Sequence, residues 1–254
     1  MSSDQNRQQI IDWLSPCDPS VNHIAAKKKH VEGTGRWFLE SNEFNDWKEG
    51  TKQSLWLHGI PGAGKTVICS TIIEEIHNSK SDIECVYFYF DFNDKQKQTV
   101  DGFLRSVIVQ ICACRHDFIT NVQSVFDKCN HGTQQPNEDV LVEILLALLQ
   151  GRRTFLFVDA LDECTERSQM AQLLKRLIGS VTDLSLLITS RQEQDIKAEL
   201  QDPMDLILSI QSAEVKVDVE LYVRKALEKD SNLKCCRKIK DEVISKLVEG
   251  ADGM

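Results

Sequence analysis

The sequence predicts an α/β fold in which a five-stranded parallel sheet is covered by helices on both faces. Five short, β-rich apolar runs alternate with longer segments of helical periodicity, which is the order of elements in such folds. Two of the runs, TFLFVD at 154–159 and LSLLITS at 184–190, are almost continuously apolar, as expected of strands buried on both faces. The 254 residues also have a globular composition, with 41% hydrophobic and 27% charged residues.

The first 50 residues are expected to be helical and irregular. Pro16 and Pro19 interrupt an opening helix, and Gly33-Thr34-Gly35 indicates a turn. After this segment, the expected strands occupy residues 54–57, 85–90, 154–158, 184–189 and 206–210.

The segments that follow the strands have the periodicity of amphipathic helices. Asn137, just after a proline, is expected to cap one of them. Apolar stripes predict helices at 67–76, 100–111, 140–148 and 170–177, followed by two more at about 214–229 and 238–249.

The composition excludes several classes of protein. With 39 acidic and 30 basic residues the net charge is −9, which argues against broad, sequence-independent binding of nucleic acid. No apolar stretch is long enough to span a membrane, and the polar N-terminus lacks a secretory signal. Nine cysteines without a CxxC pair favour reduced thiols over a disulfide scaffold or a zinc site. We therefore expect a cytoplasmic protein.

The strongest motif is GIPGAGKT at residues 59–66, a complete GxxxxGK[ST] match between an expected strand and an expected helix. Glycines let several backbone N–H groups converge on phosphate oxygens at a helix start. Lys65 is expected to reach the β- and γ-phosphates, and Thr66 to bind Mg²⁺. A tight strand-to-helix turn would explain the glycines but not the Lys-Thr pair. The predicted nucleotide contacts are Gly59, Pro61, Gly62, Ala63, Gly64, Lys65, Thr66 and Val67.

A second motif is the strand TFLFVD, which ends in the carboxylate of Asp159. An Asp at this position could be a turn residue, but downstream of a phosphate-binding loop it is typical of the Walker B arrangement. Asp159 would then bind the hydration shell of Mg²⁺. Asp162 and Glu163 would orient or deprotonate an attacking water, or else form a solvated loop or a charge pair at a helix start.

The third motif is LLITSR at 186–191, a buried strand that ends in a guanidinium group. If this strand lies beside the one that precedes GIPGAGKT, Arg191 would point at the γ-phosphate and could respond to its presence. The alternative is an arginine on the surface with no such role.

GIPGAGKT, FLFVDALDEC and LLITSR together resemble the NACHT group of P-loop NTPases, in particular fungal NACHT proteins with a nephrocystin-3-like N-terminal segment. In this group the Walker B Asp is followed by a small residue and then by two acidic residues, as in Asp159-Ala160-Leu161-Asp162-Glu163. The stretch GTGRWFLE at 33–40 is similar to the segment that those fungal proteins carry ahead of the P-loop. The resemblance covers about residues 8–254.

The resemblance implies a three-layer P-loop NTPase fold with strand order 5-1-4-3-2, a helical N-terminal segment and the start of a C-terminal helical domain. It places Thr34 and Gly35 near the base or ribose of the nucleotide. It also implies an NLR-like signalling switch, in innate immunity or heterokaryon incompatibility, that oligomerises through this domain or binds other proteins. ATP is preferred to GTP because the sequence has no guanine-reading NKxD motif.

The expected domains are a helical segment at 1–50, a NACHT nucleotide-binding domain at 51–212 and the beginning of a helical domain at 213–254. Relatives continue into further helical, winged-helix and repeat domains, so we expect a truncated product or a fragment. Hydrolysis is expected to be slow because no arginine finger can be assigned. The alternatives are a P-loop small-molecule kinase and a non-catalytic interaction module that keeps the fold.

Overall fold

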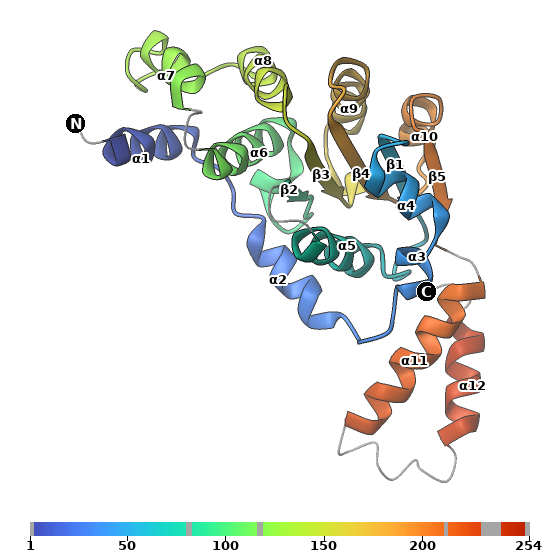
Figure 1. Ribbon diagram of the computed structural model, residues 1–254. Helices are drawn as coiled ribbons and strands as arrows, with labels where there is room; N and C mark the ends of the chain where they lie inside the picture. Colours follow the sequence, from blue (N-terminus) through green and yellow to red (C-terminus); the bar gives the residue numbers. More distant parts are fainter. Residues whose placement is uncertain (1–2, 80–82, 116–118, 211–212, 230–239, 252–254) are drawn as a thin grey trace.

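A sheet of five parallel strands forms the centre of the computed structural model, which describes residues 3–79, 83–115, 119–210, 213–229 and 240–251 (Figure 1). The strands are β1 (Ser54–His58), β2 (Glu84–Tyr89), β3 (Thr154–Asp159), β4 (Leu184–Ser190) and β5 (Leu206–Ser209). Their order is β2-β3-β4-β1-β5, and all neighbouring pairs are parallel. The expected order 5-1-4-3-2 is therefore confirmed, and each strand lies within one residue of its expected bounds.

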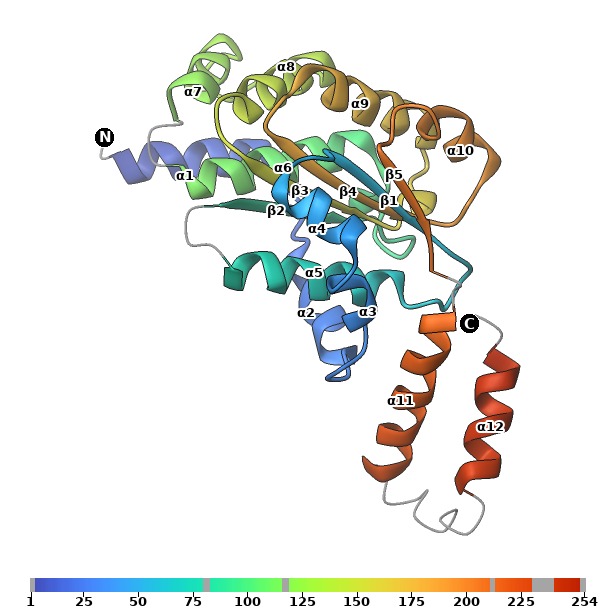
Figure 2. The same cartoon turned by 45° about the vertical axis from the view of Figure 1, so that its right-hand side comes forward.

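Helices cover both faces of the sheet, which gives the three expected layers (Figure 2). One face carries α2 (Ser20–Lys29), α3 (Arg36–Leu39), α4 (Asn42–Glu49) and α5 (Lys65–Ser79). The other carries α6 (Val100–Cys114), α8 (Glu138–Leu149), α9 (Arg167–Ser180) and α10 (Gln194–Leu200), with α1 (Ser3–Leu14) against α6 and α7 (Ile119–Lys128) against α1. Helices α11 (Ala213–Lys229) and α12 (Lys240–Ala251) pack on each other, clear of the sheet. No helix in the described residues is long and apolar enough to cross a membrane.

Alternate residues of each central strand enter two separate apolar cores, one on each face of the sheet. In β3, Phe155 and Phe157 join the core that includes α5, whereas Leu156 and Val158 join the core that includes α6 and α8. All four side chains are fully buried. A strand with neither face in water needs an uninterrupted apolar run, which is why the sequence identifies these strands so clearly.

Capping side chains determine where several helices begin. Asn137 accepts a hydrogen bond from the backbone N–H of Val140 at 3.0 Å, which confirms it as the N-cap of α8. Thr99 caps α6 in the same way. Pro16 and Pro19 lie between α1 and α2, as expected. Helices α7 and α10, in contrast, have no counterpart among the helix ranges expected from the sequence.

The N-terminal segment is built into the fold rather than appended to it. His23 of α2 is buried between Tyr89 at the end of β2, with 2.9 Å from Nδ1 to the hydroxyl, and Glu74 of α5, with 3.1 Å from Nε2 to Oε1. The indole N–H of Trp47 in α4 donates to the carbonyl of Leu186 in β4 at 3.1 Å. The segment is therefore fixed to the same strands and helix that carry the candidate site.

Candidate functional site

The loop at 59–64 joins β1 to α5 and reverses direction at two glycines. Gly62 and Gly64 have φ angles of 82° and 83°, a left-handed conformation that favours glycine over residues with a Cβ atom. Helix α5 begins directly after the loop, at Lys65, so its first turn offers backbone N–H groups without helical acceptors. Such N–H groups and the helix dipole favour an anion, and the local structure is therefore suited to phosphate.

The side chain of Lys65 lies across this loop. Its ammonium donates to the carbonyl of Gly59 at 2.7 Å and to that of Ile60 at 2.9 Å. Burial lowers the pKa of Lys65, while the nearby carboxylates of Asp162 and Asp159 act in the opposite direction. A phosphate would offer the ammonium charged acceptors in place of two neutral carbonyls, which is a stronger interaction.

Asp159, the last residue of β3, is held by two hydroxyl groups. Thr66 donates to its Oδ2 at 2.8 Å, and Thr189 of β4 donates to its Oδ1 at 2.6 Å. The residue is only 2% exposed. Burial raises the pKa of Asp159 to about 6, although both hydroxyls favour the ionised form.

Thr66 and Asp159 fit the Mg²⁺ site expected from the sequence. Both side chains offer hard oxygen ligands, the type that Mg²⁺ prefers. The two oxygens already lie 2.8 Å apart, beside the loop at 59–64. Among the described residues, no three His, Cys, Asp or Glu side chains are grouped so that they could hold a metal by themselves. Mg²⁺ takes one or two ligands from protein and the others from phosphate and water when it is bound with a nucleotide.

The chain turns sharply after β3 and brings Asp162 to Arg191. Ala160 is left-handed, with a φ angle of 56°, and a short 3₁₀ helix, η3 (Leu161–Glu163), follows. Asp162 accepts from the backbone N–H of Arg191 at 2.9 Å and pairs with its Nε at 3.0 Å. The Asp162 side chain is 7% exposed and that of Arg191 is 48% exposed. Strand β4 places Arg191 between β1 and β3, as expected.

Glu163 is held by the loop that follows β2. Its Oε2 accepts a hydrogen bond from the backbone N–H of Phe92 at 3.0 Å. Burial raises the pKa of Glu163, and the hydrogen bond from Phe92 reverses part of this effect. A half-buried carboxylate with a raised pKa is a better proton acceptor near neutral pH than an ordinary one.

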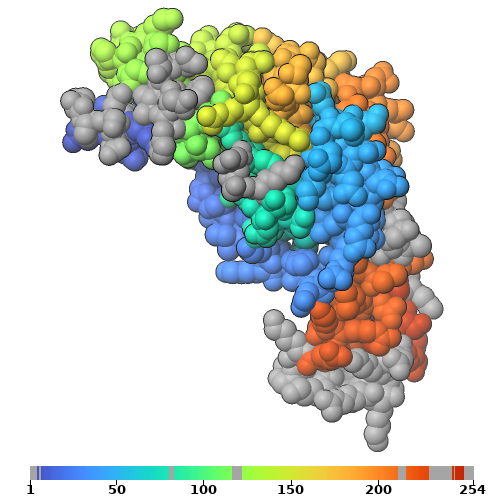
Figure 3. All heavy atoms as spheres, viewed as in Figure 1, coloured from blue at the N-terminus to red at the C-terminus, as the bar shows by residue number. Residues whose placement is uncertain are grey.

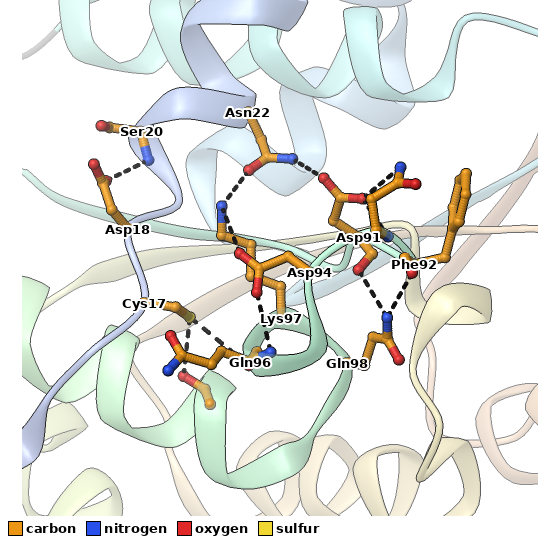
Figure 4. Close-up of polar contacts among 12 residues, drawn as sticks. Cys17, Asp18, Ser20, Asn22, Asp91, Phe92, Asp94, Gln96, Lys97 and Gln98 are labelled. Carbon is orange, nitrogen blue, oxygen red and sulfur yellow. Dashed lines mark hydrogen bonds and ion pairs between the residues drawn. The ribbon is translucent and has the colours of Figure 1, made fainter.

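Helix α2 fixes this loop, residues 91–98, from the other side (Figure 4). The side chain of Asn22 donates to Asp91 at 2.9 Å and accepts from the buried ammonium of Lys97 at 2.7 Å. Within the loop, Gln98 donates to the carbonyl of Phe92 at 2.7 Å. Glu163 is thus positioned by contacts that begin in the N-terminal segment, a connection that the sequence did not reveal.

A cavity of about 360 Å³ adjoins the loop at 59–64. The structure brings six predicted nucleotide contacts to its wall, namely Thr34, Gly35, Gly62, Ala63, Gly64 and Val67. Gly59, Lys65 and Thr66 lie next to it, at the loop and the start of α5, whereas Pro61 is exposed and outside the cavity wall. The sequence did not identify the other wall residues, which are Lys29, His30, Ile68, Thr71, Asp218, Val219 and Tyr222.

The family comparison agrees with this geometry. The model of the family described as nephrocystin 3, N-terminal, matches residues 33–191, which include the turn at Thr34, the loop at 59–66, Asp159 and Arg191. The chain belongs to the nephrocystin 3 N-terminal family. The similarity to NACHT-type NTPases expected from the motifs is therefore confirmed, and this family member has the architecture of a P-loop NTPase-like module.

A curated relative of this family member is the vegetative incompatibility protein HET-E-1 of Podospora anserina. The two are 27% identical over 214 residues, which cover 80% of the present chain but only 16% of HET-E-1. The chain thus spans about a sixth of the length of that relative. Among solved structures, a chain of the Drosophila ORC complex with AT-rich DNA and Cdc6 aligns with a TM-score of 0.36 and 14% identity. That alignment covers 98% of this chain and 84% of the other, and the likeness is loose.

Proposed function

We propose that this chain binds a nucleoside triphosphate together with Mg²⁺ and acts as a signalling switch with slow hydrolysis. The observation that carries the proposal is the cavity, because it joins the glycines of the phosphate-type loop to the turn at Thr34 and Gly35 and to α11. Its volume of about 360 Å³ falls in the range of small-molecule sites, roughly 300–1,000 Å³. One ligand with phosphate groups at one end and a nucleoside at the other would fill the cavity from the phosphate-binding glycines to α11.

At the phosphate end, the proposed contacts are the backbone N–H groups of residues 62–66 and the ammonium of Lys65. The ammonium would leave the carbonyls of Gly59 and Ile60 for phosphate oxygens. Mg²⁺, held by Thr66 and Asp159, would neutralise part of the phosphate charge. Asp159 must be ionised for this role, so binding should weaken as the pH falls below its pKa of about 6.

The opposite end of the cavity suits a flat base. Val67 and Ile68 of α5 and Val219 of α11 supply apolar surface, and the ring of Tyr222, 52% exposed, is available for stacking. We propose ATP rather than GTP as the ligand, and the absence of an NKxD motif from the sequence supports this choice. The carboxylate of Asp218 does not discriminate, because adenine and guanine each carry an amino group that it can accept from.

For hydrolysis, we propose that Glu163 orients and deprotonates the attacking water. Its raised pKa and partial burial support this role, whereas both oxygens of Asp162 are engaged by Arg191. Asp162 would instead hold Arg191 toward the γ-phosphate. Because no arginine finger can be assigned, we expect turnover of about 10⁻⁴ to 10⁻³ per second, which suits a switch better than a metabolic enzyme.

We also propose a cytoplasmic location, self-association or protein binding through the nucleotide-binding region, and a domain limit at about residue 212, with residues 1–50 as a helical segment that shares the core of the nucleotide-binding region. The role in signalling is supported by the relative HET-E-1, which is named for vegetative incompatibility. The net charge of −9 supports partners other than nucleic acid.

Thermal unfolding with Mg-ATP and with Mg-GTP tests the binding proposal. At 100 times Kd, a ligand that binds only the folded state stabilises it by about 2.7 kcal/mol, or about 5 to 10 °C for a chain of this size. We expect this shift with ATP and none in Lys65→Ala, while Lys175→Ala, an exposed lysine on α9, keeps it. No shift with either nucleotide, or an equal shift in Lys65→Ala, would favour the non-catalytic module. Faster transfer of phosphate to an added metabolite than to water would favour the kinase.

A further inference from the structure

A single carboxylate oxygen joins the two walls of the cavity that are most distant in sequence. Oδ2 of Asp218, in α11, accepts from the backbone N–H of Gly35 at 2.7 Å and from the indole N–H of Trp37 at 3.1 Å. These partners lie 183 and 181 residues away along the chain. Gly35 has a φ angle of 78°, so the turn that presents its N–H to Asp218 favours glycine.

Two further contacts of α11 support this bridge. A Cβ atom at Gly33 would lie 3.1 Å from Cδ2 of Leu221, so the helix approaches the turn closely. One turn further along, Lys225 donates to the carbonyl of Glu32 at 2.6 Å. Positions 218, 221 and 225 are spaced three and four apart and therefore share one helix face. Figure 3 shows the orange atoms of α11 against the blue atoms of the N-terminal segment.

The bridge is attached to the cavity itself. Asp218 is half-buried and lines the cavity together with Gly35. Tyr222, one turn further along α11, lines it as well. His30, which follows α2, is a titratable group close to Asp218, and its Nε2 lies 3.3 Å from the carbonyl of Thr34. The position of α11 therefore determines whether the cavity wall is complete at the place where the base of a nucleotide is expected.

We propose that Asp218 is a positioning residue that holds α11 on the turn at 33–37 and thereby closes the nucleoside end of the cavity. The inference rests on the proposed function, because it assumes that a nucleotide occupies this cavity. A ligand that contacts both α11 and the turn favours the closed arrangement by its difference in affinity for the closed and open forms. Nucleotide binding and the position of the α11–α12 pair are then coupled, each favouring the other.

This coupling acts on the base and ribose and not on the phosphates. Asp218 lies at the end of the cavity formed by Gly35 and Tyr222, whereas the phosphate contacts belong to residues 62–66 and Asp159. Inorganic tripolyphosphate has the phosphate chain without the nucleoside, so it uses only the second set of contacts. Comparing the two ligands distinguishes a positioning role of Asp218 from general damage to the fold, because general damage would weaken the binding of both.

Isothermal titration calorimetry with Mg-ATP and with Mg-tripolyphosphate, on the full chain, tests the proposal. We expect Asp218→Ala to weaken ATP binding by about tenfold, which corresponds to about 1.4 kcal/mol, and to change tripolyphosphate binding by less than about twofold. Trp37→Phe removes one of the two donors and keeps an aromatic ring, so it should weaken ATP binding to a smaller extent. Glu220→Gln is the matched control, since Glu220 lies on the same helix but pairs with Arg224.

Hydrogen exchange provides a second measurement. ATP should slow the exchange of the backbone amides of residues 213–229 in the wild type and should have little effect on them in Asp218→Ala. Equal ATP affinity in the wild type and both variants, or equal losses for ATP and tripolyphosphate, would overturn the inference. If Asp218→Ala does not fold, Trp37→Phe decides the question. Failure of the proposed function looks different, because the wild type itself would then bind neither ligand.

Discussion

At the scale of single residues, the buried carboxyl of Asp159 makes its own contribution to the pH dependence of stability. Its pKa is raised from 3.8 to about 6, so the folded chain binds this proton more readily than the unfolded chain does. The contribution of Asp159 to the stability of the folded state therefore falls as the pH rises from about 4 to about 6, and it is lost above that range. Two pKa units correspond to about 3 kcal/mol.

Asp159→Asn should accordingly stabilise the nucleotide-free protein at pH 7.5, by about 1 to 3 kcal/mol, because it removes a buried charge. The gain should shrink as the pH is lowered toward 4, where the wild-type carboxyl becomes protonated. Urea unfolding without nucleotide at several pH values measures both effects, with Asp183→Asn, an exposed carboxylate ahead of β4, as the control. A variant less stable than the wild type at pH 7.5 would contradict this account. The same variant should lose Mg-ATP binding.

At the scale of elements, the adjacent carboxylates of Asp162 and Glu163, which follow β3, have different partners and therefore different roles. Asp162 holds the first residue after β4 through two contacts with Arg191, whereas Glu163 accepts one backbone N–H from the loop at 91–98. Neutralising Asp162 should therefore affect the structure of the β4 end. Neutralising Glu163 should affect the chemistry.

We expect Glu163→Gln to bind Mg-ATP with wild-type affinity and to hydrolyse it about 10²- to 10⁴-fold more slowly. Asp162→Asn should lose about 1 to 3 kcal/mol of stability and retain more of the hydrolysis. Single-turnover hydrolysis and urea unfolding of both variants give the two readouts. If Asp162→Asn abolished turnover at unchanged stability and Glu163→Gln did not, the two roles would have to be exchanged.

The sequence predicted the strands and the phosphate-type loop well, for reasons that are local. Phe155 to Val158 are apolar on both faces, and the glycines at 62 and 64 take the left-handed conformations that the motif implies. Helix α7 was missed although Val122, Val125 and Phe126 recur at helical spacing and pack in the core that includes α6 and α8, because a helix of ten residues gives only a short apolar stripe.

At the scale of the whole molecule, the first 50 residues complete the core instead of forming a unit beside it. Phe38, Phe44 and Trp47 are at most 1% exposed and pack in the same core as Leu55 of β1 and Phe155 of β3. Truncating one buried Phe or Trp to Ala costs about 3 to 5 kcal/mol, and a whole domain has about 5 to 15 kcal/mol of stability. The nucleotide-binding region therefore depends on this segment.

A shortened chain of residues 51–254 should not unfold cooperatively, because three aromatic side chains would be missing from the core. Circular dichroism during heating, compared with the full chain, measures this. A sharp transition within a few degrees of that of the full chain would show that residues 1–50 form an independent unit.

The cavity wall on α11 illustrates what sequence patterns could not predict. Val219 and Tyr222 belong to an apolar stripe that looks the same in a core helix and in a helix that lines a cavity. Only the fold shows that their helix returns to a turn more than 180 residues earlier, where Asp218 meets Gly35 and Trp37. Long-range contacts made by one polar side chain leave no periodic signal in a sequence.

The hydrogen bond between Trp37 and Asp218 also gives the molecule an optical property. Of its four tryptophans, Trp13, Trp47 and Trp56 are buried at 5% exposure or less, while Trp37 is half-buried and donates to the carboxylate on α11. A movement of α11 would change the surroundings of Trp37 and leave the other three indoles in their cores. The native protein thus carries its own fluorescent reporter of α11, and nucleotide arrival can be followed in real time without an attached dye.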